Sequence, residues 1–443
     1  MEKADSSAVM NDILKRTLLS VCLLLLLYPI TNAQNVLTLD QCLERARSSS
    51  LRLRQSGDAI RKAEIAHSEL TSGALPAARI DVGASFAPVS KHFGYDPAAS
   101  NEGQLNGQIV VEQSIYDGGV RALKARRLRL ECERLSGLKQ SVERDVRFTV
   151  KELFIETLRA QLEADLRHES VQRLTEYQKL VKQLMAAGSA NYTDLIKTQV
   201  ELTTDSLSLW KAEELVATTR YELADLTGTP ADTGFTVAGS LDDMASSVPA
   251  AGVIGTGLDT TSNLDIQRAD LDARAGEIEV KLTKHERWPV IAAHTDAGML
   301  TTRENLRIPS PDRASIIGYS AGVSIQLPLF DWGANRYRVQ QQEITNDSLR
   351  LELTSMRRSI ALAIRKANSQ LANVAKRLGS VRANVAAAED NFLLTKASFV
   401  SGGTLALEVL NAQQLLTEAK LAELETVAEA ATLAATIEEL ITH

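Results

Sequence analysis

The residues of this chain that could carry out chemistry show none of the spacings that enzymes or metal sites require. Its six histidines have no metal-ligand spacing with one another; they are His67, His92, His168, His285, His294 and His443. The sequence has no phosphate-binding loop and no nucleophile elbow, and its Asp and Glu residues follow the spacing of solvated helix faces. We therefore expect no enzyme activity, no cofactor and no bound metal.

What the sequence does repeat is a set of turn residues. Tyr116-Asp117-Gly118-Gly119 returns as Phe330-Asp331-Trp332-Gly333, Gly188 returns as Gly402, and Asp194-Leu195-Ile196 with Gln199 returns as Glu408-Val409-Leu410 with Gln413. The offset is 214 residues each time. Each copy is typical of a strand, a tight turn, a very long helix, a glycine turn and a return helix. Neither copy can bury its apolar faces alone, so the repeat predicts an assembled object such as a tube.

The expected elements follow from periodicity and from Gly and Pro positions. The first repeat, 34–226, should hold a helix over 39–72, a β-hairpin over 79–115, a long helix over 119–187 and a return helix over 193–226. The second repeat, 263–443, should hold a helix ending near 286, a hairpin over 290–329, a long helix over 333–401 and a return helix over 405–441. Residues 227–262, rich in Gly, Ser, Thr, Asp and Pro, should form a connector, with a strand candidate at 235–237 and a place as an equatorial belt.

The long helices and the strands suit two different surroundings. Residues 119–187 and 333–401 lack proline and span about 100 Å each as helix, with apolar steps of seven, four and three that predict helix-on-helix packing. In the last strand, apolar residues alternate strictly with small polar ones from Ile317 to Leu329. The strands have the length of tilted membrane strands, although a half-buried sheet in a soluble domain is the alternative. Four strands cannot close on themselves, so membrane strands would require several chains to share one barrel.

The first 33 residues are typical of an export signal. Lys15-Arg16 precede an apolar run over 18–28, which Pro29 ends, and small residues offer a cleavage site before Gln34. A membrane anchor is the alternative, but the run is too short to span comfortably. Translation could start at Met1 or at Met10. The mature chain should be unlipidated, and its net charge of −7 argues against a nucleic-acid partner.

Two cysteines remain after that cleavage, Cys42 and Cys132. They could pair in an oxidising compartment, but two small, buried helix residues are the favoured interpretation.

The order of elements and three motifs resemble the TolC family of outer-membrane efflux proteins over about residues 36–441. The motifs are EQSIYDGG at 112–119, QLPLFDWG at 326–333 and SGGTLALEVLNAQQ at 401–414. The resemblance implies a mainly α fold with membrane β-strands, in which two tandem repeats build a long α-helical coiled-coil barrel. It also implies a homotrimer in which each chain gives four strands to a shared 12-stranded β-barrel.

The resemblance further implies a passive exit duct in the cell outer membrane, among its lipids and reaching into the periplasm. The duct would work with a periplasmic adaptor and an inner-membrane efflux or secretion transporter, which supplies the energy. The alternative function is a periplasmic adaptor with coiled-coil hairpins, but an adaptor would have one long hairpin flanked by β domains. The exported substrate is not indicated.

Two sets of site residues follow from the resemblance. The adaptor would dock at the helix tips, which here are Gly188 with Ser189, and Ser401 with Gly402 and Gly403; a plain helix cap explains these glycines equally well. Some family members carry two acids, three residues apart, at the periplasmic mouth. Glu408 matches the first, Asn411 replaces the second, and Asp194 is the first-repeat counterpart. A ring of three Glu408 side chains would favour cations, more weakly than a double ring, although a solvated helix acid is the alternative.

Overall fold

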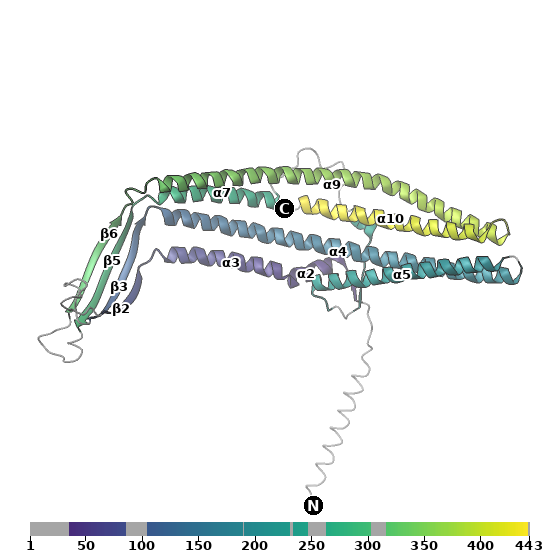
Figure 1. The fold of residues 1–443 in the computed structure, drawn as a ribbon, viewed down its shortest axis with the longest axis horizontal. Coiled ribbons are helices and arrows are strands. Elements are labelled where there is room, and N and C mark those ends of the chain that lie inside the picture. Colours follow the sequence, from purple (N-terminus) through teal and green to yellow (C-terminus); the bar gives the residue numbers. More distant parts are fainter. Residues whose placement is uncertain are drawn as a thin grey trace, which may run out of the picture.

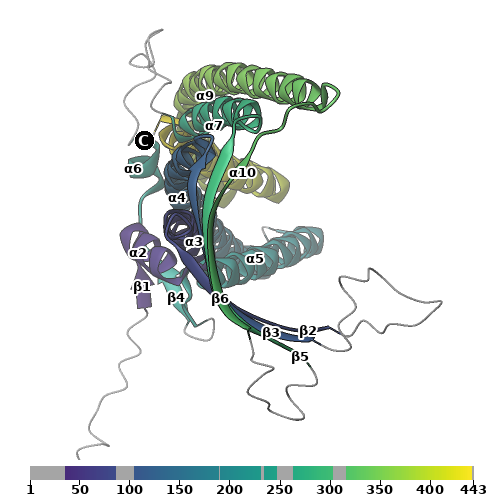
Figure 2. The same ribbon diagram turned by 90° about the vertical axis from the view of Figure 1, so that its left-hand side faces the viewer.

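The chain is an elongated, mostly helical molecule with a sheet at one end (Figure 1). The computed structural model describes residues 35–85, 104–188, 190–230, 234–246, 263–302 and 316–441. The predicted leader, 1–33, lies outside the described residues. Seen from the sheet end, the helices form an open arc, with α9 and α5 at its two ends (Figure 2).

Two very long helices run the length of the molecule. Helices α4 (Val120–Ala186) and α9 (Ala334–Val400) have 67 residues each, which corresponds to about 100 Å. Each is paired along its length by two shorter helices. Helices α3 (Leu51–Ser72) and α5 (Tyr192–Thr227) lie along α4, and α7 (Leu264–His285) and α10 (Ala406–Ile441) lie along α9. The expected order of elements is therefore present in both halves of the chain.

The single helix expected over 39–72 is wrong, because the chain bends at Ser50. Helix α2 (Leu39–Ser49) ends there, and the Ser50 side chain caps α3 by accepting a hydrogen bond from the Leu53 N–H at 3.3 Å. Ser50 has φ −59° and ψ 113°, which is not a helical conformation. A serine favours such a cap because its hydroxyl satisfies an N–H that the helix itself leaves unpaired.

The sheet contains four antiparallel strands in the order β2-β3-β5-β6. They are β2 (Ala77–Ser85), β3 (Gln104–Asp117), β5 (Val290–Thr302) and β6 (Ile316–Gln326). Strand β6 ends three residues before the predicted 329, because Pro328 has no N–H to give to a ladder. Strands β3 and β5 join the two repeats, and β2 and β6 form the outer edges.

The alternation predicted for the strands separates the two faces of the sheet. Large apolar side chains on one face are exposed; they include Ile80, Val82, Ile109, Ile317, Tyr319, Val323 and Ile325. The opposite face carries small and polar residues, such as Ser320, Ser324 and Asp296. Ser320 donates a short hydrogen bond to Asp296 across neighbouring strands. The apolar face is therefore not covered by any described part of this chain.

Both strand-to-helix turns use the same aspartate cap. The Asp117 carboxylate accepts from the N–H groups of Gly119 at 3.1 Å and Arg121 at 2.8 Å. Asp331 does the same for Gly333 at 3.0 Å and Asn335 at 2.9 Å. The repeated Asp-X-Gly motif thus fixes how each long helix leaves the sheet.

A small belt lies on the outer side of the arc (Figure 2). It consists of α2, α6 (Leu241–Ser246) and the parallel pair β1 (Asn35–Leu37) and β4 (Phe235–Val237). Phe235 and Leu37 pack with Val150, Phe154 and Leu158 of α4 in the largest core cluster. The predicted strand at 235–237 is present, whereas α6 was not predicted. Strand β4 therefore packs against the middle of α4, and α6 packs mainly against α10.

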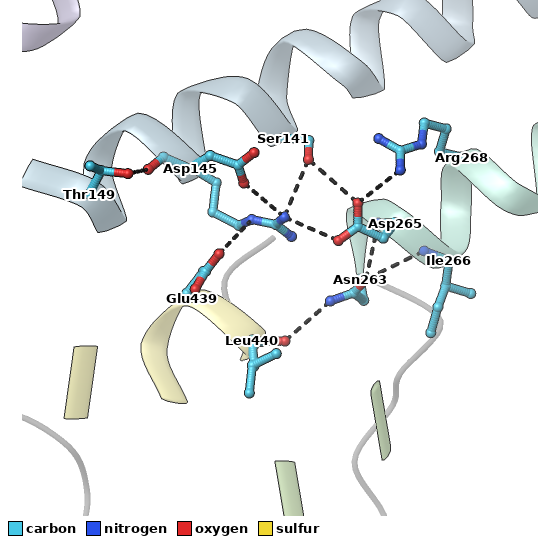
Figure 3. A network of polar contacts seen from close by, with 10 residues as sticks. Ser141, Asp145, Thr149, Asn263, Asp265, Ile266, Arg268, Glu439 and Leu440 are labelled. Carbon is cyan, nitrogen blue, oxygen red and sulfur yellow. Dashed lines mark hydrogen bonds and ion pairs between the residues drawn. The ribbon is translucent and has the colours of Figure 1, made fainter. Parts of the chain in front are cut away.

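Helices α7 and α10 lie end to end along α9, and their junction is tied by one asparagine. Asn263 caps α7 by accepting from the N–H of Asp265 at 3.0 Å. Its Nδ2 donates to the carbonyl of Leu440, near the end of α10, at 3.2 Å (Figure 3). One buried side chain thus satisfies backbone groups at both helix ends.

Arg144 of α4 joins this junction to the other repeat. Its guanidinium donates to Asp265 and to Asp145, each at 3.1 Å, and lies 4.0 Å from Glu439 of α10. The side chain is only 12% exposed. Burial raises the pKa of Glu439, while Arg144 opposes that rise. The Arg144 guanidinium therefore offsets the charge of three partly buried carboxylates, those of Asp145, Asp265 and Glu439.

Both cysteines are free thiols, Cys42 buried in α2 and Cys132 half-buried in α4. Burial raises the pKa of Cys42 to about 11, so this thiol is unreactive at neutral pH. The favoured interpretation of two unpaired helix residues agrees with this arrangement.

We predict that Arg144→Ala lowers the free energy of unfolding by about 1–3 kcal/mol, because it leaves partly buried carboxylates without their charge partner. Arg274→Ala is the matched control, since that arginine pairs with Asp270 on an exposed helix face and contributes less than about 1 kcal/mol. Chemical unfolding of the purified protein, followed by circular dichroism, measures both. Equal losses for the two variants would show that Arg144 contributes no more than an exposed ion pair does.

Candidate functional site at the helical tips

The two long helical hairpins turn at the end of the molecule opposite the sheet (Figure 1). Gly188 has φ +78° and Gly402 has φ +81°, the left-handed conformation that glycine adopts without steric cost. The N–H of Gly188 donates to the Met185 carbonyl at 3.0 Å, and that of Gly402 to the Phe399 carbonyl at 3.1 Å. Both glycines are therefore helix caps, as one of the two interpretations predicted.

The tip glycines differ in what surrounds them. No atom lies within 4 Å of the position that a Cβ would take at Gly188 or at Gly402. At Gly403 a Cβ would lie 2.8 Å from the Ser398 hydroxyl, so that glycine packs within its own turn. Ser401 donates to the Ser398 carbonyl at 2.9 Å. Ser189 lies outside the described residues. Gly188 and Gly402 thus leave the backbone at each tip open to close approach by another chain.

An apolar cluster fixes the second hairpin against the first. Leu174, Tyr177 and Val181 of α4 pack with Phe399 and Val409 near the second tip. The Tyr177 ring lies 5.5 Å from that of Phe399. Its hydroxyl donates to the Ala406 carbonyl at 3.3 Å, and burial raises its pKa. The two tips therefore move together unless this cluster separates.

A polar layer sits above the apolar cluster, and the sequence analysis did not identify it. Ser170 of α4 is fully buried and donates to Asp205 of α5 at 2.5 Å. Gln413 of α10 donates to Ser170 at 3.0 Å and accepts from Arg173 at 3.2 Å. Buried polar groups of this kind fix the register of packed helices, because a shifted register would leave them unpaired. Gln413 was part of the repeat pattern, which was the only signal for it.

The predicted acidic residues are placed differently from one another. Glu408 and Asn411 are exposed and lie about one turn apart on the same face of α10. The Thr404 hydroxyl donates to Glu408 at 2.6 Å. Asp194 instead closes a capping box with Asn191 at the start of α5. Glu408 is thus exposed and accepts a hydrogen bond from Thr404, whereas Asp194 caps the start of α5.

The described residues contain no group of three or more His, Cys, Asp or Glu side chains placed to hold a metal ion. Among these residues, no helix is both long enough and apolar enough to cross a membrane. What the tip geometry offers is an open backbone surface beside an exposed carboxylate.

The junction between sheet and helices carries a second group of exposed side chains. The rings of Phe330 and Trp332 meet edge to face at 4.6 Å and are 71% and 87% exposed. Trp288 is half-exposed and stacks on His285 at 5.2 Å. Aromatic side chains at the end of an apolar sheet face are typical of a membrane boundary.

Comparison with known proteins agrees with this geometry. Residues 260–442 match the family described as outer membrane efflux protein. The proteases secretion protein PrtF of Dickeya chrysanthemi is 24% identical over 316 residues, which cover 68% of this chain and 67% of PrtF. The cobalt-zinc-cadmium resistance protein CzcC of Cupriavidus metallidurans is 24% identical over 327 residues, 73% of this chain and 74% of CzcC. The crystal structure of CusC has the same fold, with a TM-score of 0.78 over 91% of both chains at 13% identity.

We predict that Gly402→Ala and Gly118→Ala differ in cost although both glycines have positive φ. Gly402→Ala should cost only the backbone strain, about 1 kcal/mol, because its surroundings are open. At Gly118 a Cβ would lie 2.7 Å from the Trp288 Cβ, which adds a clash of about 1–3 kcal/mol. Thermal unfolding of both variants tests this order. A larger loss at Gly402 would contradict the open geometry of the tip.

Proposed function

Because this chain belongs to the outer membrane efflux protein family, we propose that three copies form a passive exit duct from the periplasm to the cell exterior. Its family membership makes the protein a component of the outer membrane that extends into the periplasm, and a channel protein rather than an enzyme. The duct works with a periplasmic adaptor and an inner-membrane efflux or secretion transporter. The transporter supplies the energy, and the duct conducts passively.

The observation that carries the proposal is a sheet that is incomplete in one chain. Four strands are too few to close, and β2 and β6 are unpaired on their outer sides in this sheet. The helical layer is equally open, since it forms an arc with α9 and α5 at its ends (Figure 2). Three copies would give twelve strands and a closed ring of helices, which removes every open edge.

The two faces of the sheet support its place in a membrane. Ile317 and Tyr319 on the apolar face are 81% and 88% exposed, which suits contact with lipid and not with water. The polar face, with Asp296 and Ser320, suits a water-filled lumen. The aromatic residues Trp288, Phe330 and Trp332 would then mark the periplasmic boundary of the membrane. A periplasmic adaptor would not need a sheet whose apolar face is exposed in this way.

The helical tips support docking of the adaptor. Gly188 and Gly402 hold the ends of both hairpins in an open conformation without side chains, and a partner hairpin could approach the backbone closely there. Ser401 and Gly403 stabilise the second turn from within. Ser189, which lies beside Gly188 in the sequence, would take part in the same contact.

The periplasmic mouth of the duct is proposed to lie between the α10 helices. Three exposed Glu408 side chains around the threefold axis would form one carboxylate ring, with Asn411 a turn further along. Asp194 is not part of this ring, because it caps α5. A single acidic ring gives a modest preference for cations.

The names of the two relatives point to different cargoes, since PrtF is named for the secretion of proteases and CzcC for resistance to cobalt, zinc and cadmium. The proposed cargo of this duct is therefore either small molecules and ions or proteins. A deletion strain tested for sensitivity to metal salts, drugs and dyes, and for secreted protein, separates these classes.

We predict that Gly402→Arg abolishes export while the assembled protein stays in the outer membrane, because the side chain blocks the tip. Gly379→Arg is the matched control, since Gly379 is an exposed glycine in the middle of α9 with no atom within 4 Å of its Cβ position. Complementation of the deletion strain measures export, and outer-membrane fractionation measures assembly. Export that survives Gly402→Arg would exclude the tips as the docking site.

We predict that Asn411→Asp strengthens the preference of the channel for cations and its block by divalent cations, because it adds a second carboxylate ring. Glu408→Gln should weaken both. Glu343→Gln serves as control, since Glu343 pairs with Lys284 near the opposite end of the molecule. Reversal potentials of single channels in a salt gradient give the selectivity. If neither Asn411→Asp nor Glu408→Gln alters the selectivity, α10 does not line the mouth.

A further inference from the structure

We propose that the contact between neighbouring copies repeats the contact between the two halves of one chain, so that Val82 of one copy lies opposite Ile325 of the next. The partner surface is thus a second copy of this chain in a defined strand register. This inference rests on the oligomeric duct proposed above and adds the residues that meet. We call the contact between the two halves of one chain the internal seam, and the contact between copies the outer seam.

The two halves correspond residue by residue. Helices α4 and α9 have the same length at an offset of 214 residues, and so do α5 and α10. Helices α3 and α7 have 22 residues each at an offset of 213. Strands β2 and β5 share that second offset, because Val111 faces Ala78 where its equivalent, Ile325, faces Ile291. The position of any residue in one half therefore identifies a partner in the other half.

The internal seam covers helix α7 on two sides, by α9 of its own half and α4 of the other. Helix α3, its equivalent, has α4 of its own half and packs against no second long helix of this chain to a comparable extent. Ile278 of α7 is 3% exposed, whereas its equivalent Ile65 is 62% exposed. Leu264 is 5% exposed and its equivalent Leu51 is 68% exposed. The same apolar positions are buried at the internal seam and bare at the edge.

The return helices show the same difference. Leu424 of α10 is 9% exposed, whereas its equivalent in α5, Trp210, is 62% exposed. Ala435 is 7% exposed and its equivalent Tyr221 is 59% exposed. The edge helix α5 thus carries larger apolar side chains than the buried helix α10 at these positions. Such side chains fit a surface that another helix covers.

The long helices α4 and α9 show the same difference in exposure at the other edge of the arc, which α9 forms. Leu123 and Leu130 of α4 are half-buried, whereas their equivalents in α9, Tyr337 and Ile344, are 64% and 67% exposed. Helix α9 would therefore meet α3 and α5 of the next copy, as α4 meets α7 and α10 within the chain. The two exposed edges are therefore complementary. The edge formed by α3 and α5 is equivalent to α7 and α10 at the internal seam, and the edge formed by α9 is equivalent to α4.

The strand register follows from the ladder at the internal seam. Val111 of β3 faces Thr295 of β5, and Val110 faces Asp296. Applying the two offsets places Ile325 of β6 opposite Val82 of β2 in the next copy, and Ser324 opposite Gly83. Ile325 and Val82 both lie on the exposed apolar face, and Ser324 and Gly83 both lie on the polar face. The register therefore keeps both faces continuous across the outer seam, which a shift of one residue would not do.

One position departs from strict repetition. At the internal seam, Gly118 lies so close to Trp288 that a Cβ there would be 2.7 Å from the Trp288 Cβ. The equivalents at the outer seam are Trp332 and Leu75, which are 87% and 67% exposed. Trp332 also has φ +54°, a strained conformation for a residue with a side chain. The Trp332 indole would cover Leu75 of the next copy and hold the seam wider at this end.

Paired cysteines test the register in the full-length protein in outer membranes. Val82→Cys with Ile325→Cys, and Gly83→Cys with Ser324→Cys, represent the two kinds of opposed positions in an antiparallel ladder. After mild oxidation with copper–phenanthroline, at least one of the two should shift most of the protein from monomer to dimer and trimer bands on a non-reducing gel. Val82→Cys with Val323→Cys is the control, because its Cβ atoms would lie about 7–8 Å apart, too far for a disulfide. Each single cysteine is a second control, since all variants keep Cys42 and Cys132.

The outcomes separate this inference from the proposed function. Wild-type protein that migrates as a monomer after mild extraction, with no heat-modifiable oligomer, would overturn the oligomeric duct itself. A stable oligomer in which only Val82→Cys with Val323→Cys forms crosslinks would leave the duct standing and overturn the register. A stable oligomer in which neither matched pair forms crosslinks would likewise overturn it.

Discussion

A strand edge in a membrane needs a partner, because hydrocarbon offers no hydrogen bonds to unpaired backbone groups and each such group costs several kcal/mol. In one copy of this protein, β2 and β6 present such edges, and both lie on a sheet whose apolar face is uncovered. The helical layer has the same property in another form, since α3, α5 and α9 expose apolar side chains at the ends of the arc. A single chain therefore has open edges in both its sheet and its helical layer. The proposed duct exists only where several copies close around an axis.

The length of the helical layer depends on how its shorter helices are joined end to end. Helices of 22 and 36 residues lie end to end along partners of 67 residues, and every helix end leaves backbone groups to be satisfied. Asn263 satisfies such groups on both sides where α7 meets α10, and the Arg144 guanidinium reaches from α4 to the Asp265 side chain beside it. The belt of α2, α6 and two short strands packs against the same middle region of α4. The helices of one chain are thus held together at their middle.

The tips combine rigidity and access. Tyr177 and the buried Ser170 fix the second hairpin to the first, and the left-handed glycines keep the turn surfaces bare. Rigidity and access therefore come from different residues that lie close together. A side chain at the glycine positions would strain the backbone and occupy the open surface. Glu408 and Asn411 lie on the exposed face of α10, directly beside this fixed region. A partner that contacts the tips would therefore act close to the proposed mouth.

The sequence alone determined the order of elements, the alternation of the strands, the capped turns and the family resemblance, because periodicity and turn chemistry are local properties. Periodicity did not predict the break at Ser50 or the end of β6 at Gln326, because a serine cap and the missing N–H of Pro328 override the periodic pattern there. Nor did it predict helix α6, which packs mainly against α10. The sequence also could not separate Asp194 from Glu408, which occupy equivalent positions in the repeat. Only the tertiary structure assigned one carboxylate to a helix cap and left the other exposed, and only it placed Ser170, Asp205 and Gln413 in one buried layer. Contacts between residues far apart in the chain depend on how helices are arranged in space, which no local pattern encodes.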